Sequence, residues 1–153
     1  MGRPAEKVIA LAQIATCPGQ LQHNLERHLD MVARARQVGA HLVVFPELSL
    51  SGYLLAHGVL EHAVRLDDPL LAPLLEASRD LALLVGLPLR EAQGGISNAA
   101  VLLEGGEVRG VHRKLYLPTY GKGGASTPIF YGGINVFLQQ KLRIFRWTPR
   151  WLD

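Results

Sequence analysis

Residues 41–53 read His41-Leu-Val-Val-Phe45-Pro-Glu47-Leu-Ser-Leu-Ser-Gly-Tyr53. An apolar run that stops at a proline is typical of a short buried strand, so we predict a strand over 41–45. In α/β sheets functional groups gather just beyond the carboxyl ends of the strands, where Glu47 stands. We expect partial desolvation there to raise the pKa of Glu47 and make it a proton acceptor. The alternative is a solvated loop glutamate.

A second polar segment, His112-Arg-Lys114-Leu-Tyr-Leu-Pro-Thr-Tyr120, follows the last strand expected in this part of the chain. Lys114 would lie at the end of that strand. A lysine facing a carboxylate can stabilise a developing oxyanion by its charge. The alternative is a basic strand end that faces water.

The elements around these segments alternate between strand and helix. We predict strands over 8–15, 41–45, 81–87, 97–103 and 108–113, and helices over 21–38, 54–65 and 68–80. Asp68-Pro69 is typical of a helix start, Gly39 of a helix end, and Gly105-Gly106 of a hairpin turn. This order predicts an α/β fold with a mixed sheet.

Composition limits the class of protein. Of the 153 residues, 48% are hydrophobic and 19% are charged, which indicates one folded domain and not a disordered chain. No apolar stretch approaches the ~20 residues of a membrane span, and no signal peptide is recognised. The single cysteine excludes an intrachain disulfide and a cysteine-based zinc site. We therefore expect a soluble, cytoplasmic protein that does not bind membranes.

The formal charge of +3 is unevenly distributed. Residues 1–121 carry 11 basic and 12 acidic side chains, whereas residues 122–153 carry 5 basic and 1 acidic. The same tail holds 6 of the 10 Phe, Trp and Tyr residues. We place a boundary near 121–124. Trp147 and Trp151 beside arginines could form a nucleic-acid platform, but we favour a frayed or non-native terminus and do not expect a nucleic-acid partner.

The motifs at 45–53 and 112–118 resemble the glutamate and lysine motifs of the carbon–nitrogen hydrolase (nitrilase) superfamily. The form Tyr116-Leu-Pro-Thr-Tyr-Gly121 is most similar to the glutaminase domain of glutamine-dependent NAD synthetases. The resemblance covers residues 7 to about 121 and implies the N-terminal half of an α-β-β-α sandwich with a mixed sheet. It also implies that Glu47 is the general base, that Lys114 stabilises the oxyanion, that the substrate is a small-molecule amide, and that no cofactor is needed.

The family's third catalytic group, a cysteine on a later strand, has no counterpart. Cys17 is the only cysteine and lies far upstream of both motifs, where we expect a small half-buried residue in a turn. Ser126 and Thr127 supply no substitute. We expect a chain that is inactive or nearly so, with residues 122–153 the product of a shifted reading frame or a truncated gene. Two alternatives stay open: a non-catalytic partner subunit or binding module, and amide hydrolysis without the cysteine.

Two further expectations concern surfaces. Half a sandwich leaves one sheet face uncovered, so we expect a homo-oligomer or another association through that face. The remaining histidines show no metal-ligand spacing and are interpreted as solvated or core-edge residues, so no metal site is expected. They are His23, His28, His41, His57 and His62.

Overall fold

A computed structural model describes residues 6–53, 56–114 and 141–147. The strands are β1 Lys7–Gln13, β2 Leu42–Val44, β3 Ala82–Arg90, β4 Ile96–Glu104, β5 Glu107–Arg113 and β6 Lys141–Trp147. The helices are α1 Leu21–Gln37, α2 Ala56–Glu61 and α3 Ala72–Ala77, with a 3-10 turn over Pro69–Leu71 before α3. None of the described helices is long and apolar enough to cross a membrane.

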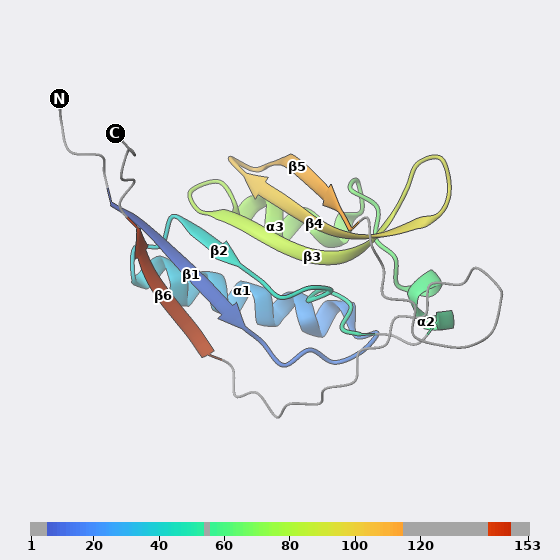
Figure 1. Cartoon of the computed structure of the whole chain (residues 1–153), viewed down its shortest axis with the longest axis horizontal. Helices are drawn as coiled ribbons and strands as arrows, with labels where there is room; N and C mark the ends of the chain where they lie inside the picture. Colours follow the sequence, from blue (N-terminus) through green and yellow to red (C-terminus); the bar gives the residue numbers. More distant parts are fainter. Residues whose placement is uncertain (1–5, 54–55, 115–140, 148–153) are drawn as a thin grey trace.

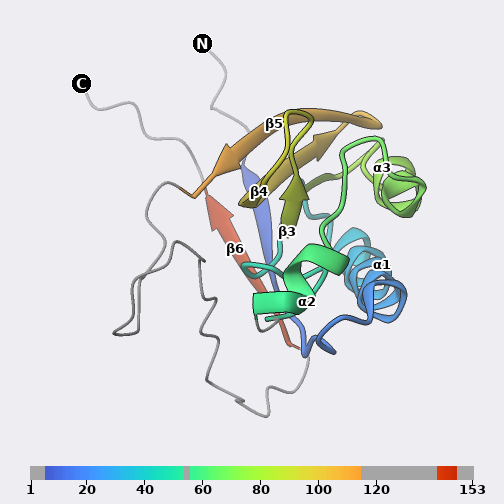
Figure 2. The same ribbon diagram turned by 90° about the vertical axis from the view of Figure 1, so that its right-hand side faces the viewer.

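The strands form one six-stranded sheet in the order β5-β4-β3-β2-β1-β6. The central strands β1, β2 and β3 run parallel, and β4, β5 and β6 join antiparallel to their neighbours (Figure 1). The expectation of an α/β fold with a mixed sheet is confirmed. Helices α1 and α3 lie together on one side of this sheet (Figure 2).

Helix α1 forms where the apolar spacing predicts it. Its buried residues Leu25, His28, Val32 and Ala35 recur every three to four residues, and the three apolar ones pack into the core together with Met31. Gly39 follows the helix with φ 68°, a conformation that glycine adopts without strain and that ends the helix.

Two turns also follow their local chemistry. Gly105 and Gly106 have φ values of 65° and 81° and connect β4 to β5, as the hairpin signal predicts. The Asp68 side chain accepts a hydrogen bond from the Leu70 amide at 2.9 Å and caps the 3-10 turn that leads into α3.

The helix expected over 54–65 is wrong in its extent, because α2 ends at Glu61. Beyond it, Val64 forms a parallel bridge with Leu89 of β3, and its amide donates to the Pro88 carbonyl at 2.9 Å. Val64 is 1% exposed. Pairing with the sheet buries the Val64 side chain and satisfies the hydrogen bonds of its backbone. Together these stabilise residue 64 more than another turn of helix would.

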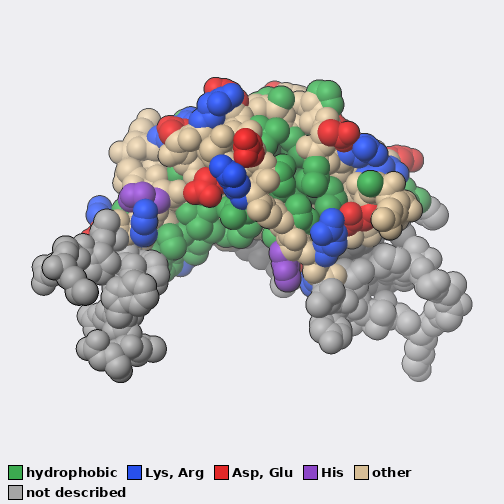
Figure 3. Space-filling model, turned by 90° about the horizontal axis from the view of Figure 1, so that it is seen from above, with side chains coloured by type: hydrophobic (Ala, Val, Ile, Leu, Met, Phe, Trp, Pro, Cys, Tyr) green, Lys and Arg blue, Asp and Glu red, His purple; other side chains and the backbone are tan. Residues whose placement is uncertain are grey.

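The two faces of the sheet differ in burial. On β3, Leu83 and Val85 point toward the helices and are 0% and 1% exposed, whereas Leu84 between them lies on the opposite face and is half-buried. On β1, Leu11 of that opposite face is 37% exposed. We call this second side the open face. Figure 3 shows hydrophobic side chains gathered in the middle of the view and along its hollow lower margin, between charged groups.

Strand β6 was not expected from the sequence. It pairs with β1 along all seven of its residues, from Lys141 opposite Gln13 to Trp147 opposite Lys7, and Leu142 packs against the core. The expectation of a frayed terminus is therefore wrong for residues 141–147. Polar and apolar residues alternate strictly only over 141–144, and the adjacent apolar pair Ile144-Phe145 then interrupts the pattern that marks a strand. The boundary placed near 121–124 lies outside the described residues.

Candidate functional site

Glu47 lies in a tight turn directly after β2. The Phe45 amide bonds to the Leu84 carbonyl at 2.9 Å and the Leu50 amide to the Gly86 carbonyl at 3.0 Å, so both ends of the turn are anchored on β3. Leu48 has φ 52°, which is unusual for a residue with a side chain, and it is 2% exposed. Burial of Leu48 and the two anchors hold this strained conformation in place.

The turn can approach β3 this closely because position 86 is glycine. A Cβ atom on Gly86 would meet the Pro46 carbonyl oxygen and would lie 2.6 Å from the Leu48 nitrogen. Both neighbours are backbone atoms, which cannot move aside as a flexible side chain could. Gly86 therefore sets the distance between the sheet and the residue that follows Pro46, which is Glu47.

Two buried polar residues of α1 support the turn from behind. Asn24 donates to the Leu50 carbonyl at 2.9 Å, and His28 Nε2 lies 2.9 Å from the Ser49 hydroxyl. His28 Nδ1 lies 2.7 Å from the Asn24 carbonyl, which only accepts, so Nδ1 carries the proton and Nε2 accepts from Ser49. Its ring centroid is 4.3 Å from that of Phe45.

The burial of His28 corrects the sequence interpretation. It is 0% exposed, not solvated or at the core edge. Burial lowers its pKa to about 4, against the opposing effect of the hydrogen bond to the Asn24 backbone. His28 is therefore neutral over the ordinary pH range, which suits its role as an acceptor for Ser49.

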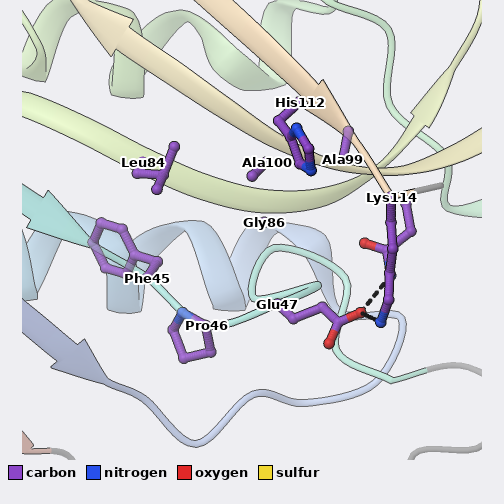
Figure 4. Close-up of a pocket in the computed structure, with 10 residues that line it drawn as sticks. Phe45, Pro46, Glu47, Leu84, Gly86, Ala99, Ala100, His112 and Lys114 are labelled. Carbon is purple, nitrogen blue, oxygen red and sulfur yellow. Dashed lines mark hydrogen bonds and ion pairs between the residues drawn. The ribbon is translucent and has the colours of Figure 1, made fainter. Parts of the chain in front are cut away.

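The Glu47 carboxylate receives three hydrogen bonds from the part of the chain that the structure describes. Lys114 Nζ lies 2.8 Å from Oε1, and the Asn98 side-chain amide donates to the same oxygen at 2.6 Å. The Tyr53 hydroxyl donates to Oε2 at 3.2 Å. Figure 4 shows Glu47 and Lys114 facing each other across the site, with β2 and β5 bringing them from 67 positions apart in the chain. The structure thus brings together the two site residues that the sequence singled out.

The expectation that the pKa of Glu47 is raised is wrong in its net direction. Desolvation is the largest single cause and does raise this pKa. The hydrogen bonds from Lys114, Asn98 and Tyr53 and the charge of Lys114 together outweigh it and hold the pKa below the ordinary value. The Glu47 side chain is 40% exposed, so its desolvation is incomplete. Glu47 is accordingly an ionised carboxylate at neutral pH.

A cavity of about 310 Å³ opens beside this carboxylate on the open face of the sheet. Most of its lining is apolar or backbone, and Glu47 and Lys114 lie together at one end of it (Figure 4). The lining residues are Phe45, Pro46, Glu47, Leu84, Gly86, Asn98, Ala99, Ala100, His112 and Lys114. The volume suits a small molecule, with a proton acceptor and a cationic donor next to each other.

Cys17 lies elsewhere, between β1 and α1. It is half-buried, as expected, and its backbone amide and carbonyl are both bound by the Asn24 side chain, at 2.8 and 2.9 Å. It does not line the cavity. Within the described ranges, no cluster of three or more His, Cys, Asp or Glu side chains could hold a metal ion.

Sequence reasoning missed Asn98 as a partner of Glu47. The signal available was an amide that begins the apolar stretch of strand β4, since residues 99–103 are all apolar, and Asn98 is 5% exposed. Tyr53 belongs to the glutamate motif, but the motif alone does not predict its contact with Glu47. Buried polar side chains are nearly always hydrogen-bonded, so an amide in such a strand points to an unseen partner.

Comparison with known proteins identifies the family of this chain. Residues 8–133 match the carbon-nitrogen hydrolase family, and the chain belongs to that family. Among its relatives, glutamine-dependent NAD(+) synthetases of Mycobacterium tuberculosis and of Xanthomonas campestris are 42% identical over 109 residues and 36% identical over 118 residues. These alignments cover 69% and 73% of this chain but 16% and 20% of the relatives. The chain thus spans less than a quarter of their length.

Solved structures give the same result. The chain superposes on the glutamine-dependent NAD+ synthetase of Acinetobacter baumannii, solved with ADP, with a TM-score of 0.65 at 26% identity, covering 77% of this chain and 22% of that one. An amidase from Nesterenkonia sp. AN1, solved in complex with acrylamide as a double mutant, gives a TM-score of 0.65 at 31% identity, covering 79% of this chain and 47% of that one. Within its family, the chain is close to the glutaminase domain of the NAD synthetases.

Proposed function

We propose that this chain carries the glutamate–lysine part of an amide-hydrolysing site of glutaminase type. Glu47 is the general base and Lys114 stabilises the oxyanion. The observation that carries the proposal is the 2.8 Å contact between Lys114 Nζ and Glu47 Oε1 at the polar end of a cavity for a small molecule. The related amidase supports it, since a glutamate and a cysteine are the residues replaced in its complex with acrylamide.

The arrangement suits an attack on an amide carbon. An ionised Glu47 can take the proton of an attacking thiol, which becomes a stronger nucleophile. As the carbonyl oxygen gains negative charge, the Lys114 ammonium can donate a hydrogen bond to it. Each bond that Lys114 redirects from Glu47 to this oxygen also raises the basicity of Glu47, so the two roles assist each other.

The attacking thiol is the missing part. Cys17 is the only cysteine of the 153 residues and is held between β1 and α1, away from the cavity. We infer that these residues on their own hydrolyse amides weakly or not at all, because the remaining base and cation lack a covalent route.

Ammonia release from glutamine by the purified chain tests this inference. We expect release at the background rate, and the same rate for the Glu47→Gln variant. Turnover above background that disappears in Glu47→Gln would show that the chain hydrolyses amides without the family's cysteine. Turnover above background that Glu47→Gln leaves unchanged would contradict the role given to Glu47.

We also propose that residues 122–153 derive from a shifted reading frame or a truncated gene, because their charge and aromatic content differ from those of residues 1–121. The match to the family continues to residue 133, so the nucleotide sequence should be read from codon 121 through codon 133 and beyond. A second frame that encodes a cysteine followed by an acidic residue in a family-like context is expected. Absence of any such frame would contradict the proposal.

A non-catalytic role as a partner subunit or binding module is the second candidate, and the open face favours it. Leu11 and Phe145 of this face are 37% and 51% exposed. Apolar groups gathered in this way are typical of surfaces that associate. We expect the chain to elute as an oligomer on size exclusion and Leu11→Lys to shift elution toward the monomer. A wild-type monomer with a sharp thermal transition would contradict this role.

A further inference from the structure

We propose that Asn98 is a positioning residue that ties Glu47 to Lys114 and leaves Oε2 of Glu47 as the oxygen that accepts the proton. The role in proton transfer rests on the function proposed above. The geometric part stands on contacts of the described residues alone.

Asn98 contacts both members of the pair through different groups. Its side-chain amide donates to Glu47 Oε1 at 2.6 Å, and its backbone carbonyl accepts from the Lys114 amide at 2.9 Å. Asn98 is therefore the residue through which strand β4 fixes the carboxylate and the start of the lysine segment relative to each other.

The hydrogen bonds divide the carboxylate into two unequal oxygens. Oε1 receives two N–H donors, from Asn98 and Lys114, which fills its two lone-pair directions. Among the residues that the structure describes, Oε2 receives the Tyr53 hydroxyl alone, at the longer distance of 3.2 Å. One lone-pair direction of Oε2 thus stays open to a new donor, and this is the atom at which a proton can arrive without displacing a partner.

Asn98 is also the better-held of the two N–H donors. It is 5% exposed in the interior of a nine-residue strand, whereas the Lys114 side chain is 39% exposed on a flexible stem. Without Asn98 the carboxylate could rotate with Lys114 as its main partner, because a long exposed side chain gives little orientational restraint. A short amide on a strand fixes the direction of Oε1 and, through it, of Oε2.

The test uses nuclear magnetic resonance of the full chain labelled at the glutamate carboxyl carbons and at the side-chain amides. Glu47→Gln assigns the Glu47 signal. In the wild type we expect the Asn98 amide signal to move with pH at the same midpoint as the Glu47 carboxyl signal. An Asn98 amide signal that does not change as Glu47 is protonated would overturn the proposal. This measurement needs no variant of Asn98.

Asn98→Leu supplies the second arm, because leucine has a similar volume and no donor. We expect the Glu47 midpoint to rise by about half a pH unit or more, since the ionised form loses a hydrogen bond. The matched control is Ser97→Ala, one residue away, which removes a hydrogen bond to Glu91 instead. The other titratable groups at this cavity, Lys114, Tyr53 and His112, are unchanged in both variants.

The outcomes separate the two proposals. A midpoint unchanged in a folded Asn98→Leu protein would overturn the positioning role, whatever the result with glutamine. A midpoint that shifts as expected, together with glutamine turnover above background that Glu47→Gln leaves unchanged, would keep Asn98 as the partner of Glu47 and reject the proposed function. A shift of equal size in Ser97→Ala would also overturn the proposal, because a substitution elsewhere in β4 would then change the Glu47 midpoint as much as the loss of Asn98 does.

Discussion

The two faces of the sheet are built from alternate residues of the same strands, yet they differ in packing and in chemistry. The face under α1 and α3 is apolar and almost fully buried, with Leu83 and Val85 at 0% and 1% exposure. The open face is partly exposed, and it holds the cavity, the Glu47 carboxylate and the Lys114 ammonium. One face therefore supplies the stability of the fold, and the other uses that rigid support to present polar groups.

Two polar residues on the helix-covered side support the site on the open face. Asn24 and His28 come from α1, but they bind the carbonyl of Leu50 and the hydroxyl of Ser49 in the turn that carries Glu47. The helix-covered side thus holds the site in position through the sheet layer. Substitutions on the two faces should separate stability from site geometry.

Leu83 and Leu84 give the largest expected difference, because they are neighbours on opposite faces. Leu83→Ala should lower the free energy of unfolding by about 3–4 kcal/mol, the cost of a cavity in a packed core. Leu84→Ala, at a half-buried position that lines the cavity, should cost about 1 kcal/mol. Urea unfolding of both variants measures the difference. Equal losses in the free energy of unfolding would contradict the difference between the two faces and would show that the open face is packed in solution.

Gly86→Ala tests the contact between the two regions. The new methyl group would meet backbone atoms of Pro46 and Leu48, so the turn must move away from β3. We expect a loss of about 3 kcal/mol in the free energy of unfolding and displacement of Glu47 from Lys114. Gly110→Ala in β5 is the matched control, because nothing lies within 4 Å of its added Cβ. A Gly86→Ala protein as stable as Gly110→Ala would show that the turn does not need this close approach.

The sequence predicted those parts of the fold that local chemistry determines. The spacing of apolar residues in α1, the cap at Asp68 and the two glycines at 105 and 106 each specify their own conformation, and the structure has all three. The end of α2 and the strand β6 depend on pairing with distant strands, through Val64 and through β1. A local pattern carries no information about such partners.

The site shows the same division. Glu47 and Lys114 could be found because each follows a strand in a motif of its own. The partners of Asn98 and His28 could not be found, because these contacts are with residues 51 and 21 positions away along the chain. The predicted direction of the Glu47 pKa was wrong because it took account of burial alone, whereas the hydrogen bonds from Lys114, Asn98 and Tyr53 and the charge of Lys114 together outweigh burial.

The pH dependence of stability tests the support from behind the sheet. The pKa of His28 is about 4 in the folded chain against 6.5 for an ordinary histidine. As pH falls from 6.5 toward 4, the unfolded chain binds a proton that buried His28 does not, so stability falls by up to about 3 kcal/mol and then levels off. His28→Gln should flatten this part of the profile in chemical denaturation. An unchanged slope would assign the loss to other groups.

The ion pair of the open face has the smallest expected effect on stability. Both side chains are about 40% exposed, so Lys114→Met should lower the free energy of unfolding by less than about 1 kcal/mol. Its geometry is tested by a water-soluble carbodiimide, which activates the Glu47 carboxyl for attack by the Lys114 amine, with net loss of one water from the chain. Peptide mapping should locate this amide between Glu47 and Lys114.

Lys114→Arg is the matched control for that experiment, because it keeps the positive charge and removes the amine. It should retain stability and lose the cross-link, whereas Gly86→Ala should lose both. A cross-link that persists in Gly86→Ala would mean that Lys114 follows the displaced carboxylate. The attraction between Glu47 and Lys114 would then set the geometry of the site, and the packed side of the sheet under α1 and α3 would not.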